Sequence, residues 1–380
     1  MSAHVVVIGA GVTGLSAATR LQDAGHSVTI VARDFPTPFE TIDARASINY
    51  TSPWGGAHNR WVVPPPPSSS STSSSAAARI LARDHSFALE TYRHMDALSR
   101  DRPEAGVTFM PGIEYLEDPD GSEGGGGILT ESRAAELGIE AFRVLDAAEL
   151  PVGVRWGCSY RTWCVNPMVY LAFLLRRLAR RGARLVRREV RGPEEAWTLG
   201  AVDVVVNCSG VGFGDPAVFI TRGQTCLVSN SCDATVTRQN ADGSWTFCVP
   251  RNFDGGTVIG GTKQPDDWDP EPSAAVRELR SSAKQWLRRR IHRPYPSILA
   301  GGNGRFEPMA DIVGRRPTRR GGMRLELETL PGKGERDGVR HVVHAYGLGG
   351  RGYELSWGVA GRVVELVASR DKVGSERAKL

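Results

Sequence analysis

The chain lacks any long hydrophobic run. No window offers roughly 18 consecutive apolar residues, so no membrane-spanning helix is predicted. Its six cysteines include no CxxC pair, and its histidines form no cluster at metal-ligand spacing, which argues against a zinc site; reduced thiols are the default expectation. No unit of about 20–50 residues recurs, and the 44 glycines follow no period, which excludes solenoid and collagen-like chains.

Lysine is also scarce. Only five of the 47 basic residues are lysine and 42 are arginine, in a chain of net charge +5. The arginines are dispersed, with local clusters at 176–181, 288–290 and 315–320, and aromatic residues do not interleave with them. A solvated arginine-rich surface is therefore expected, and a nucleic-acid partner is not.

Enough apolar sequence is present to build a folded core. The chain has 380 residues, of which 41% are hydrophobic and 23% charged. This composition excludes disorder of the whole chain. The length predicts two domains, or one large α/β domain with an inserted lobe.

The first 32 residues have the pattern of a nucleotide-binding βαβ unit. Residues 4–8 (HVVVI) predict a buried strand, residues 15–25 a helix, and residues 26–32 (HSVTIVA) a second strand. Between the first strand and the helix lies GAGVTG, a GxGxxG motif. Gly9 permits the tight turn, Gly11 lets the backbone approach a pyrophosphate, and Gly14 lets the helix pack on the sheet. A dinucleotide site is predicted here.

Arg33 and Asp34 follow the second strand, about 20 residues after the last glycine, where a contact to a ribose or an adenine-side phosphate is expected. The motif does not distinguish FAD from a nicotinamide cofactor. Its position at the N-terminus, with the second half of the fold far downstream, favours FAD.

The rest of the chain predicts a discontinuous cofactor domain interrupted by a sheet-rich segment. Helices are expected at 76–100, 166–181, 273–290 and 355–369, and strands at 107–115, 183–190, 204–207 and 339–345. Alternating segments at 223–228, 245–249 and 257–261 predict an antiparallel sheet. Pro- and Ser-rich sequence within 62–79, and glycines at 121–127, predict surface loops.

A second glycine-rich motif follows the last predicted strand. Residues 342–352 (VVHAYGLGGRG) and the WGVA at 357–360 predict a strand, a turn and a helix. The exposed N-terminus of such a helix suits the N1/C2=O edge of a flavin, where negative charge accumulates on reduction.

This C-terminal motif resembles the signature of the D-amino-acid oxidase family, which includes D-aspartate oxidases. Similar segments run in the expected order along nearly the whole chain. They are SPWGGA at 52–57, CVNP at 164–167, VVNCSG at 205–210, RGQ at 222–224, GGT at 260–262 and RPTR at 316–319. The low-complexity stretch at 64–75 departs from the family pattern.

The resemblance implies an α/β protein with a discontinuous Rossmann-like FAD-binding domain and an inserted, mostly antiparallel substrate domain. Residues 1–60, 155–220 and 335–375 are assigned to the first domain, and 80–154 and 221–334 to the second. The implied reaction transfers a hydride from Cα of a D-amino acid to N5 of non-covalently bound FAD. The imino acid hydrolyses to a 2-oxo acid and ammonia, and O2 reoxidises the flavin to give hydrogen peroxide. No side-chain base is required, so catalysis rests on positioning and electrostatics.

The same resemblance assigns residues to the site. Arg319 is expected to clamp the substrate carboxylate, with its neighbours Arg316 and Arg320 as alternatives, and the Gly350 carbonyl to accept a hydrogen bond from the substrate amine. Phe247, Lys263 and Arg238 are expected around the substrate side chain. The residues expected to bind the cofactor are Gly9, Ala10, Gly11, Val12, Thr13, Gly14, Arg33, Asp34, Ser52, Gly55, Gly56, Ala57, Val190, Cys208, Ser209, Gly210, Arg319, Gly349, Gly350, Gly352, Tyr353 and Glu354.

The sequence allows more than one class of substrate. Phe247, where the family usually has a tyrosine, suits neutral side chains, whereas cations at Arg238 and Lys263 suit D-aspartate or D-glutamate. General D-amino-acid oxidation is favoured, with an acidic preference as the alternative and oxidation of glycine or sarcosine as a third option. A nicotinamide-dependent dehydrogenase and a non-catalytic flavoprotein are the competing classes.

The final residues, Ala378-Lys379-Leu380, resemble a peroxisomal address. A peroxisomal location suits an enzyme that makes peroxide. The expected partners are accordingly a small D-amino acid, O2, a peroxisomal import receptor and, in a homodimer, a second copy of the chain.

Overall fold

The computed structural model describes residues 2–37, 48–65, 75–119, 128–274, 306–331 and 339–377. Most of the predicted helix at 273–290, the predicted loop at 121–127, most of the Pro/Ser-rich stretch and the tripeptide Ala378-Lys379-Leu380 lie outside these residues. Within the described part of the chain, no helix has the length and apolar character needed to cross a bilayer, and no group of three or more metal-ligating side chains gathers.

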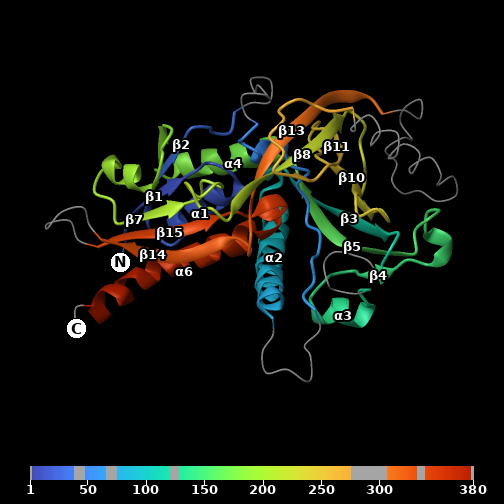
Figure 1. Cartoon of the computed structure of the whole chain (residues 1–380), viewed down its shortest axis with the longest axis horizontal. Helices are drawn as coiled ribbons and strands as arrows, with labels where there is room; N and C mark the ends of the chain where they lie inside the picture. Colours follow the sequence, from blue (N-terminus) through green and yellow to red (C-terminus); the bar gives the residue numbers. More distant parts are fainter. Residues whose placement is uncertain are drawn as a thin grey trace.

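The strands form two sheets, which lie at opposite ends of the view in Figure 1. The first sheet has the order β14-β15-β7-β1-β2-β6. Its strands are β1 (His4–Ile8), β2 (Ser27–Ala32), β6 (Arg184–Arg187), β7 (Val204–Asn207), β14 (Arg324–Leu330) and β15 (Arg340–Tyr346). All neighbours in it are parallel except β14, which runs antiparallel to β15.

The second sheet has the order β12-β8-β11-β10-β9-β3-β5-β4, with β13 paired to β8. Its strands are β3 (Val107–Leu116), β4 (Arg143–Val144), β5 (Trp156–Val165), β8 (Val218–Val228), β9 (Thr235–Gln239), β10 (Trp245–Pro250), β11 (Thr257–Gly260), β12 (Gln264–Pro265) and β13 (Pro308–Arg319). Every pairing is antiparallel except that of β3 with β9. The predicted antiparallel sheet is therefore confirmed.

Most helices lie against the first sheet or between the two sheets, and one short helix, Glu131–Glu136, lies near β4 (Figure 1). They are α1 (Val12–Asp23), α2 (Ala76–Asp101), α3 (Glu131–Glu136), α4 (Pro167–Arg180) and α6 (Gly352–Arg377). Helix α1 packs against α4 and α6, and α2 packs against α6, β3 and β5. At the start of α4, the Asn166 side chain accepts a hydrogen bond from the Met168 N–H at 3.1 Å, and Pro167 occupies the first turn.

The main hydrophobic core lies between the first sheet and its helices. Val5 and Val7 of β1 and Leu15 and Leu21 of α1 are fully buried. Continuous β-branched strands of this kind are typical of a parallel sheet that is covered on both faces.

The structure differs from the predicted domain boundaries in three places. β5 was assigned to the cofactor domain with residues 155–220, but it pairs with β3 in the second sheet. β14 was assigned to the substrate domain with residues 221–334, but it pairs with β15 in the first sheet. Helix α2 begins at Ala76, inside the predicted 62–79 loop. Sheet pairing joins residues that are distant in sequence, and composition does not reveal such pairing.

Candidate active site

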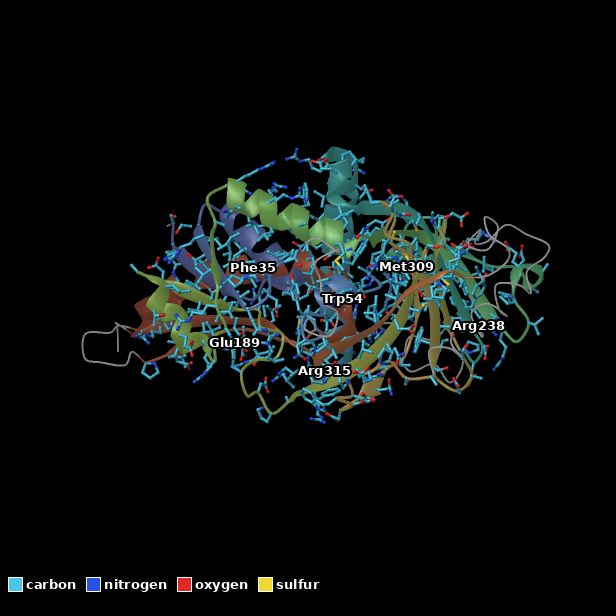
Figure 2. The ribbon with its side chains drawn as sticks, turned by 90° about the horizontal axis from the view of Figure 1, so that it is seen from above. Phe35, Trp54, Glu189, Arg238, Met309 and Arg315 are labelled. Atoms are coloured by element: carbon cyan, nitrogen blue, oxygen red, sulfur yellow. The ribbon has the colours of Figure 1, made fainter. Side chains whose placement is uncertain are left out.

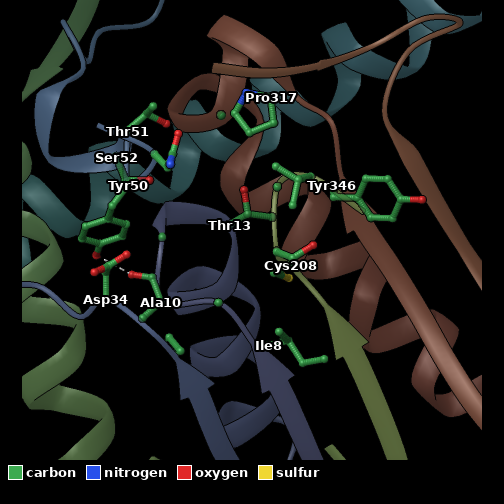
Figure 3. Close-up of a pocket in the computed structure, with 18 of the residues that line it drawn as sticks. Ile8, Ala10, Thr13, Asp34, Tyr50, Thr51, Ser52, Cys208, Pro317 and Tyr346 are labelled. Carbon is green, nitrogen blue, oxygen red and sulfur yellow. Dashed lines mark hydrogen bonds between the residues drawn. The ribbon is translucent and has the colours of Figure 1, made fainter. Parts of the chain in front are cut away.

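The carboxyl ends of β1, β2, β7 and β15 open into a cavity of about 400 Å³, here called the cofactor cavity. Figure 3 shows its centre, with Ala10 and Thr13 above β1 and Cys208 at the end of β7. The predicted cofactor residues that line it are Gly9, Ala10, Gly11, Val12, Thr13, Arg33, Asp34, Ser52, Val190, Cys208, Ser209, Gly210, Gly349 and Gly352.

The glycine motif leaves room at this cavity that side chains would fill. Gly9 has φ +103°, and a Cβ there would lie 2.5 Å from the carbonyl oxygen of Cys208. A Cβ at Gly14 would overlap the carbonyl oxygen of Gly9. Gly14 therefore does not line the cavity, but it lets α1 approach β1, which is the packing role that the motif predicts.

The N-terminus of α1 faces the cofactor cavity and suits an anionic group. The N–H groups of its first turn and the helix dipole favour phosphate. The Ser52 hydroxyl accepts a hydrogen bond from the Val12 N–H at 3.1 Å, and the Tyr50 hydroxyl donates to the Ala10 carbonyl at 2.7 Å (Figure 3). Thus residues 50–52 lie against the start of α1, and the backbone that would cradle the diphosphate of a dinucleotide is in place.

The far end of the cofactor cavity carries charged side chains. Arg33 Nε lies 2.9 Å from Asp34 Oδ2, and Arg33 Nη1 lies 3.4 Å from Glu189 Oε1. The Asp34 carboxylate offers the acceptor that a ribose hydroxyl needs. The residues present therefore fit the adenosine half of FAD.

A second cavity of about 240 Å³, here called the substrate cavity, shares Val12, Thr51, Ser52, Gly349 and Gly352 with the first. Further predicted cofactor residues line it: Gly55, Gly56, Ala57, Gly350, Tyr353 and Glu354. The Tyr353 hydroxyl donates a 2.8 Å hydrogen bond to the Ser52 carbonyl. The glycine-rich segments 52–57 and 347–352 thus meet at both cavities, and their residues would hold an isoalloxazine.

Arg316 supplies the positive charge of the substrate cavity. Its side chain lines the cavity, and among the described residues no carboxylate or other acceptor pairs with it. The surrounding protein lowers the pKa of Arg316 by desolvation. A desolvated guanidinium without an anion is costly, and a ligand carboxylate is its natural bidentate partner.

The prediction that Arg319 is the carboxylate clamp is wrong. Arg319 Nε donates to Asp215 Oδ2 at 2.8 Å, its Nη1 donates to the Gly322 carbonyl at 3.2 Å, and it lines neither cavity. The reason is the period of the strand: both arginines lie on β13, and positions three apart point to opposite faces. The same placement removes Arg319 from the predicted cofactor contacts.

Of the three residues predicted around the substrate side chain, only Phe247 lines the substrate cavity. Arg238 on β9 donates through Nε to Glu117 Oε1 at 2.7 Å, at the end of the second sheet away from Trp54 (Figure 2). Lys263 follows β11 and lines neither cavity. The structure therefore does not bring Arg238 or Lys263 to the substrate cavity, and the Arg238 side chain is held by Glu117 instead.

Sequence reasoning missed several lining residues. His58 lines the substrate cavity, with Nδ1 3.2 Å from the Gly56 carbonyl, and Nε2 has no partner among the described residues. Burial lowers its pKa, which favours the neutral ring. Arg315 and Trp268 line the cofactor cavity. The SPWGGA segment pointed to the neighbourhood of His58, but nothing local pointed to Trp268.

Comparison with known proteins agrees with this site. A family model described as FAD dependent oxidoreductase matches residues 4–366. A D-aspartate oxidase from Talaromyces thermophilus is 42% identical, over 98% of this chain and 97% of that protein. A D-amino-acid oxidase from Schizosaccharomyces pombe is 30% identical, over 94% of this chain and 93% of that protein.

Solved structures of low identity share the fold. A glycine oxidase from Geobacillus kaustophilus has a TM-score of 0.60 at 19% identity, covering 97% of this chain and 95% of that one. An L-alpha-glycerophosphate oxidase from Mycoplasma pneumoniae with FAD bound has a TM-score of 0.63 at 13% identity, covering 97% and 95%. These comparisons confirm the predicted fold class, the predicted FAD cofactor and the resemblance to the D-amino-acid oxidase family. The chain belongs to the D-amino-acid oxidase family of FAD-dependent oxidoreductases.

Proposed function

We propose that the protein oxidises D-amino acids with a preference for acidic side chains, D-aspartate above all. The observation that carries this proposal is the Arg316 guanidinium, which has no acceptor among the described residues and lies in a small cavity beside the cofactor cavity. A volume of about 240 Å³ is below the roughly 300–1,000 Å³ of typical ligand pockets, which favours a small substrate.

The residues of the chain would bind and orient the substrate. Arg316 would hold the α-carboxylate through two N–H donors, and the Gly350 carbonyl would accept a hydrogen bond from the amine. The Phe247 ring forms an apolar wall of the cavity. Glu354 also lines the cavity, but Arg351 neutralises it through a 2.5 Å ion pair, so it does not act as a free base.

The chemistry that FAD supplies when bound is acceptance of a hydride from the substrate Cα and delivery of the electrons to O2, which gives hydrogen peroxide. The imino acid that leaves the site then hydrolyses in water to a 2-oxo acid and ammonia.

The acidic preference has two supports. Sequence alone favoured neutral substrates, but the relative that is 42% identical is a D-aspartate oxidase, which supports the alternative more strongly. His58 offers a second polar contact in the substrate cavity. Its Nδ1 faces a carbonyl and so carries the proton of the neutral ring; a side-chain carboxylate would favour protonation of Nε2 as well.

Neutral D-amino acids are the second candidate substrates. The Phe247 ring favours them, because an apolar wall offers nothing to a second carboxylate. The 30% identical D-amino-acid oxidase supports the same reading.

The test compares D-aspartate, D-glutamate, D-alanine and D-methionine by peroxide release. We expect kcat/KM to be highest for D-aspartate. Arg316→Met should lower kcat/KM for every substrate by about 10²–10³-fold, since a buried charge pair is lost, while bound flavin is retained. Faster turnover of D-methionine than of D-aspartate would contradict the acidic preference. A kcat/KM that is unchanged in Arg316→Met would show that Arg316 does not bind the substrate carboxylate.

The pH profile tests the contact to His58. Burial and Arg60 lower the pKa of His58, whereas Glu114 and the Gly56 carbonyl raise it, and the net shift is downward. The free ring is then neutral near pH 7, and binding of a second carboxylate takes up a proton. The ratio of kcat/KM for D-aspartate to that for D-alanine should therefore rise as pH falls from 8 to 6. Deprotonation of the substrate amine affects both substrates and cancels in this ratio.

A further inference from the structure

Two neighbouring arginines on β13 serve different cavities. Arg316 lines the substrate cavity, whereas Arg315 and Pro317 line the cofactor cavity. Alternation along a strand explains this division, because successive side chains point to opposite faces. The second sheet thus brings a positive charge to the cofactor cavity, whose floor comes from the first sheet.

Among the described residues, two of the three arginines that line the cofactor cavity pair with carboxylates, and Arg315 does not. Arg33, Arg188 and Arg315 all line this cavity. Arg33 pairs with Asp34 and Glu189, and Arg188 Nη2 lies 3.2 Å from Glu195 Oε2.

Arg315 instead donates to neutral acceptors, the Trp268 carbonyl and, at 3.5 Å, Asn49 Oδ1. Its Nε is buried and has no partner in the part of the chain that the structure describes. This guanidinium is therefore available to an anionic ligand.

The backbone around Arg315 places it beside the segment that covers the start of α1. The Arg315 N–H donates to the Ile48 carbonyl at 3.1 Å. Residues 50–52 follow directly and contact Ala10 and Val12 at the N-terminus of α1. The Trp268 ring lies 5.3 Å from the Arg315 guanidinium carbon, and this contact restrains the guanidinium at the edge of the cavity (Figure 2 labels Arg315).

We propose that Arg315 binds the diphosphate of FAD and that Trp268 holds its guanidinium in position. The N-terminus of α1 would supply one positive contact to the diphosphate, and Arg315 would supply a second from the other sheet. Cofactor binding would then draw the two sheets together as well as fill the cavity.

The experiment measures FAD affinity of the apoprotein, without substrate, so its outcome is independent of the substrate proposal. Apoprotein is titrated with FAD, and binding is followed by flavin fluorescence at several NaCl concentrations. Arg315→Met should raise the Kd for FAD by about 10- to 100-fold, as expected for loss of a charge-assisted hydrogen bond to phosphate. Its Kd should also depend less on salt than that of the wild type.

Two further variants separate charge from shape. Arg320→Met is the matched control, because Arg320 is exposed, lines neither cavity and lies 3.9 Å from Asp266. It should bind FAD within twofold of the wild type. Arg315→Lys keeps the charge but loses the planar fork, and its Kd should fall between the wild type and Arg315→Met.

Three results would overturn the proposal. They are a Kd for Arg315→Met within twofold of the wild type, a weakening that is equal at every salt concentration, and a greater loss in Trp268→Leu than in Arg315→Met. The last result would assign the indole, rather than the guanidinium, to the cofactor. Melting temperatures of the apoproteins show whether a variant is folded. If Arg315→Met is unfolded, the Kd of Arg315→Lys is compared with that of the wild type instead.

Discussion

At the scale of single residues, Gly223 makes space for the substrate clamp. It lies on β8, next to β13, and a Cβ at Gly223 would lie 2.5 Å from Cζ of Arg316 and overlap the end of its guanidinium. The absence of a side chain on one strand therefore allows the arginine of the next strand to reach the substrate cavity.

We predict that Gly223→Ala displaces the Arg316 side chain and lowers kcat/KM for D-amino acids by about tenfold or more, because misplacing a positioning group costs rate. Bound flavin, measured by its absorbance, should be retained. In an Arg316→Met background the same substitution should cost little, since residues in contact are not additive. An equal loss in both backgrounds would contradict a role through Arg316.

The same residues show what the sequence could and could not predict. The glycines of the GxGxxG motif were placed correctly because their roles follow from a local strand-turn-helix pattern. The choice of Arg319 over Arg316 failed because it depended on which face of a strand each residue occupies. The prediction for Arg238 failed for a related reason, because its partner Glu117 lies 121 positions away in the chain.

At the scale of elements, charged side chains join helices α2 and α6 at the glycine-rich turn 347–352, where α6 begins. Arg351 lies between Gly350 and Gly352, and it pairs with Glu354 at 2.5 Å and with Asp84 of α2 at 3.1 Å. Burial raises the pKa of Glu354 and the ion pair opposes this shift. The turn that lines both cavities is therefore fixed by ion pairs of Arg351, which itself lines neither cavity.

We predict that Arg351→Met destabilises the protein by about 3–5 kcal/mol, because it leaves the buried Glu354 carboxylate without its cation. The measurement is thermal unfolding of the holoprotein, with FAD release on the same scan. Arg362→Met is the control, since its pair with Glu365 lies on the exposed side of the same helix and should change stability by about 0–1 kcal/mol. The double variant Arg351→Met/Glu354→Gln should recover part of the loss, and equal effects of Arg351→Met and Arg362→Met would contradict the prediction.

Elements with strong local patterns were predicted well, and elements defined by pairing were not. β1 and β7 match their predicted ranges, and α2 and α4 differ by a residue at one or both ends. β13 was missed because its end reads GRRPTR, in which charge and proline hide a strand, although it pairs with β8 along nearly its full length. β5 and β14 were also missed, and with them the true extent of each sheet.

At the scale of the whole molecule, Asp215 connects the two sheets beside the cofactor cavity. Its Oδ2 accepts hydrogen bonds from Arg319 Nε at the end of β13 and from the Tyr346 hydroxyl at the end of β15, both at 2.8 Å. Its Oδ1 accepts from the Ala217 N–H at 2.9 Å. The arginine that was predicted to bind substrate therefore has a structural partner, and that partner is a carboxylate that sequence reasoning did not select.

This junction gives a prediction about acid stability. The Arg319 guanidinium lowers the pKa of Asp215 to about 2 in the folded protein. Aspartates of an unfolded chain have a pKa of about 3.9, so folding favours the ionised form of Asp215. A group whose pKa is lower in the folded state stabilises the protein fully at pH values above its unfolded-state pKa. This stabilisation is lost as the pH falls towards its folded-state pKa. Asp215→Asn should therefore lower Tm by about 2–5 °C at pH 7, and its difference from the wild type should shrink between pH 4 and pH 2. Glu365→Gln, which removes an exposed pair, should show little difference at any pH. A difference for Asp215→Asn that stays constant down to pH 2 would mean that shape, rather than the carboxylate charge, holds the two sheets together at this point.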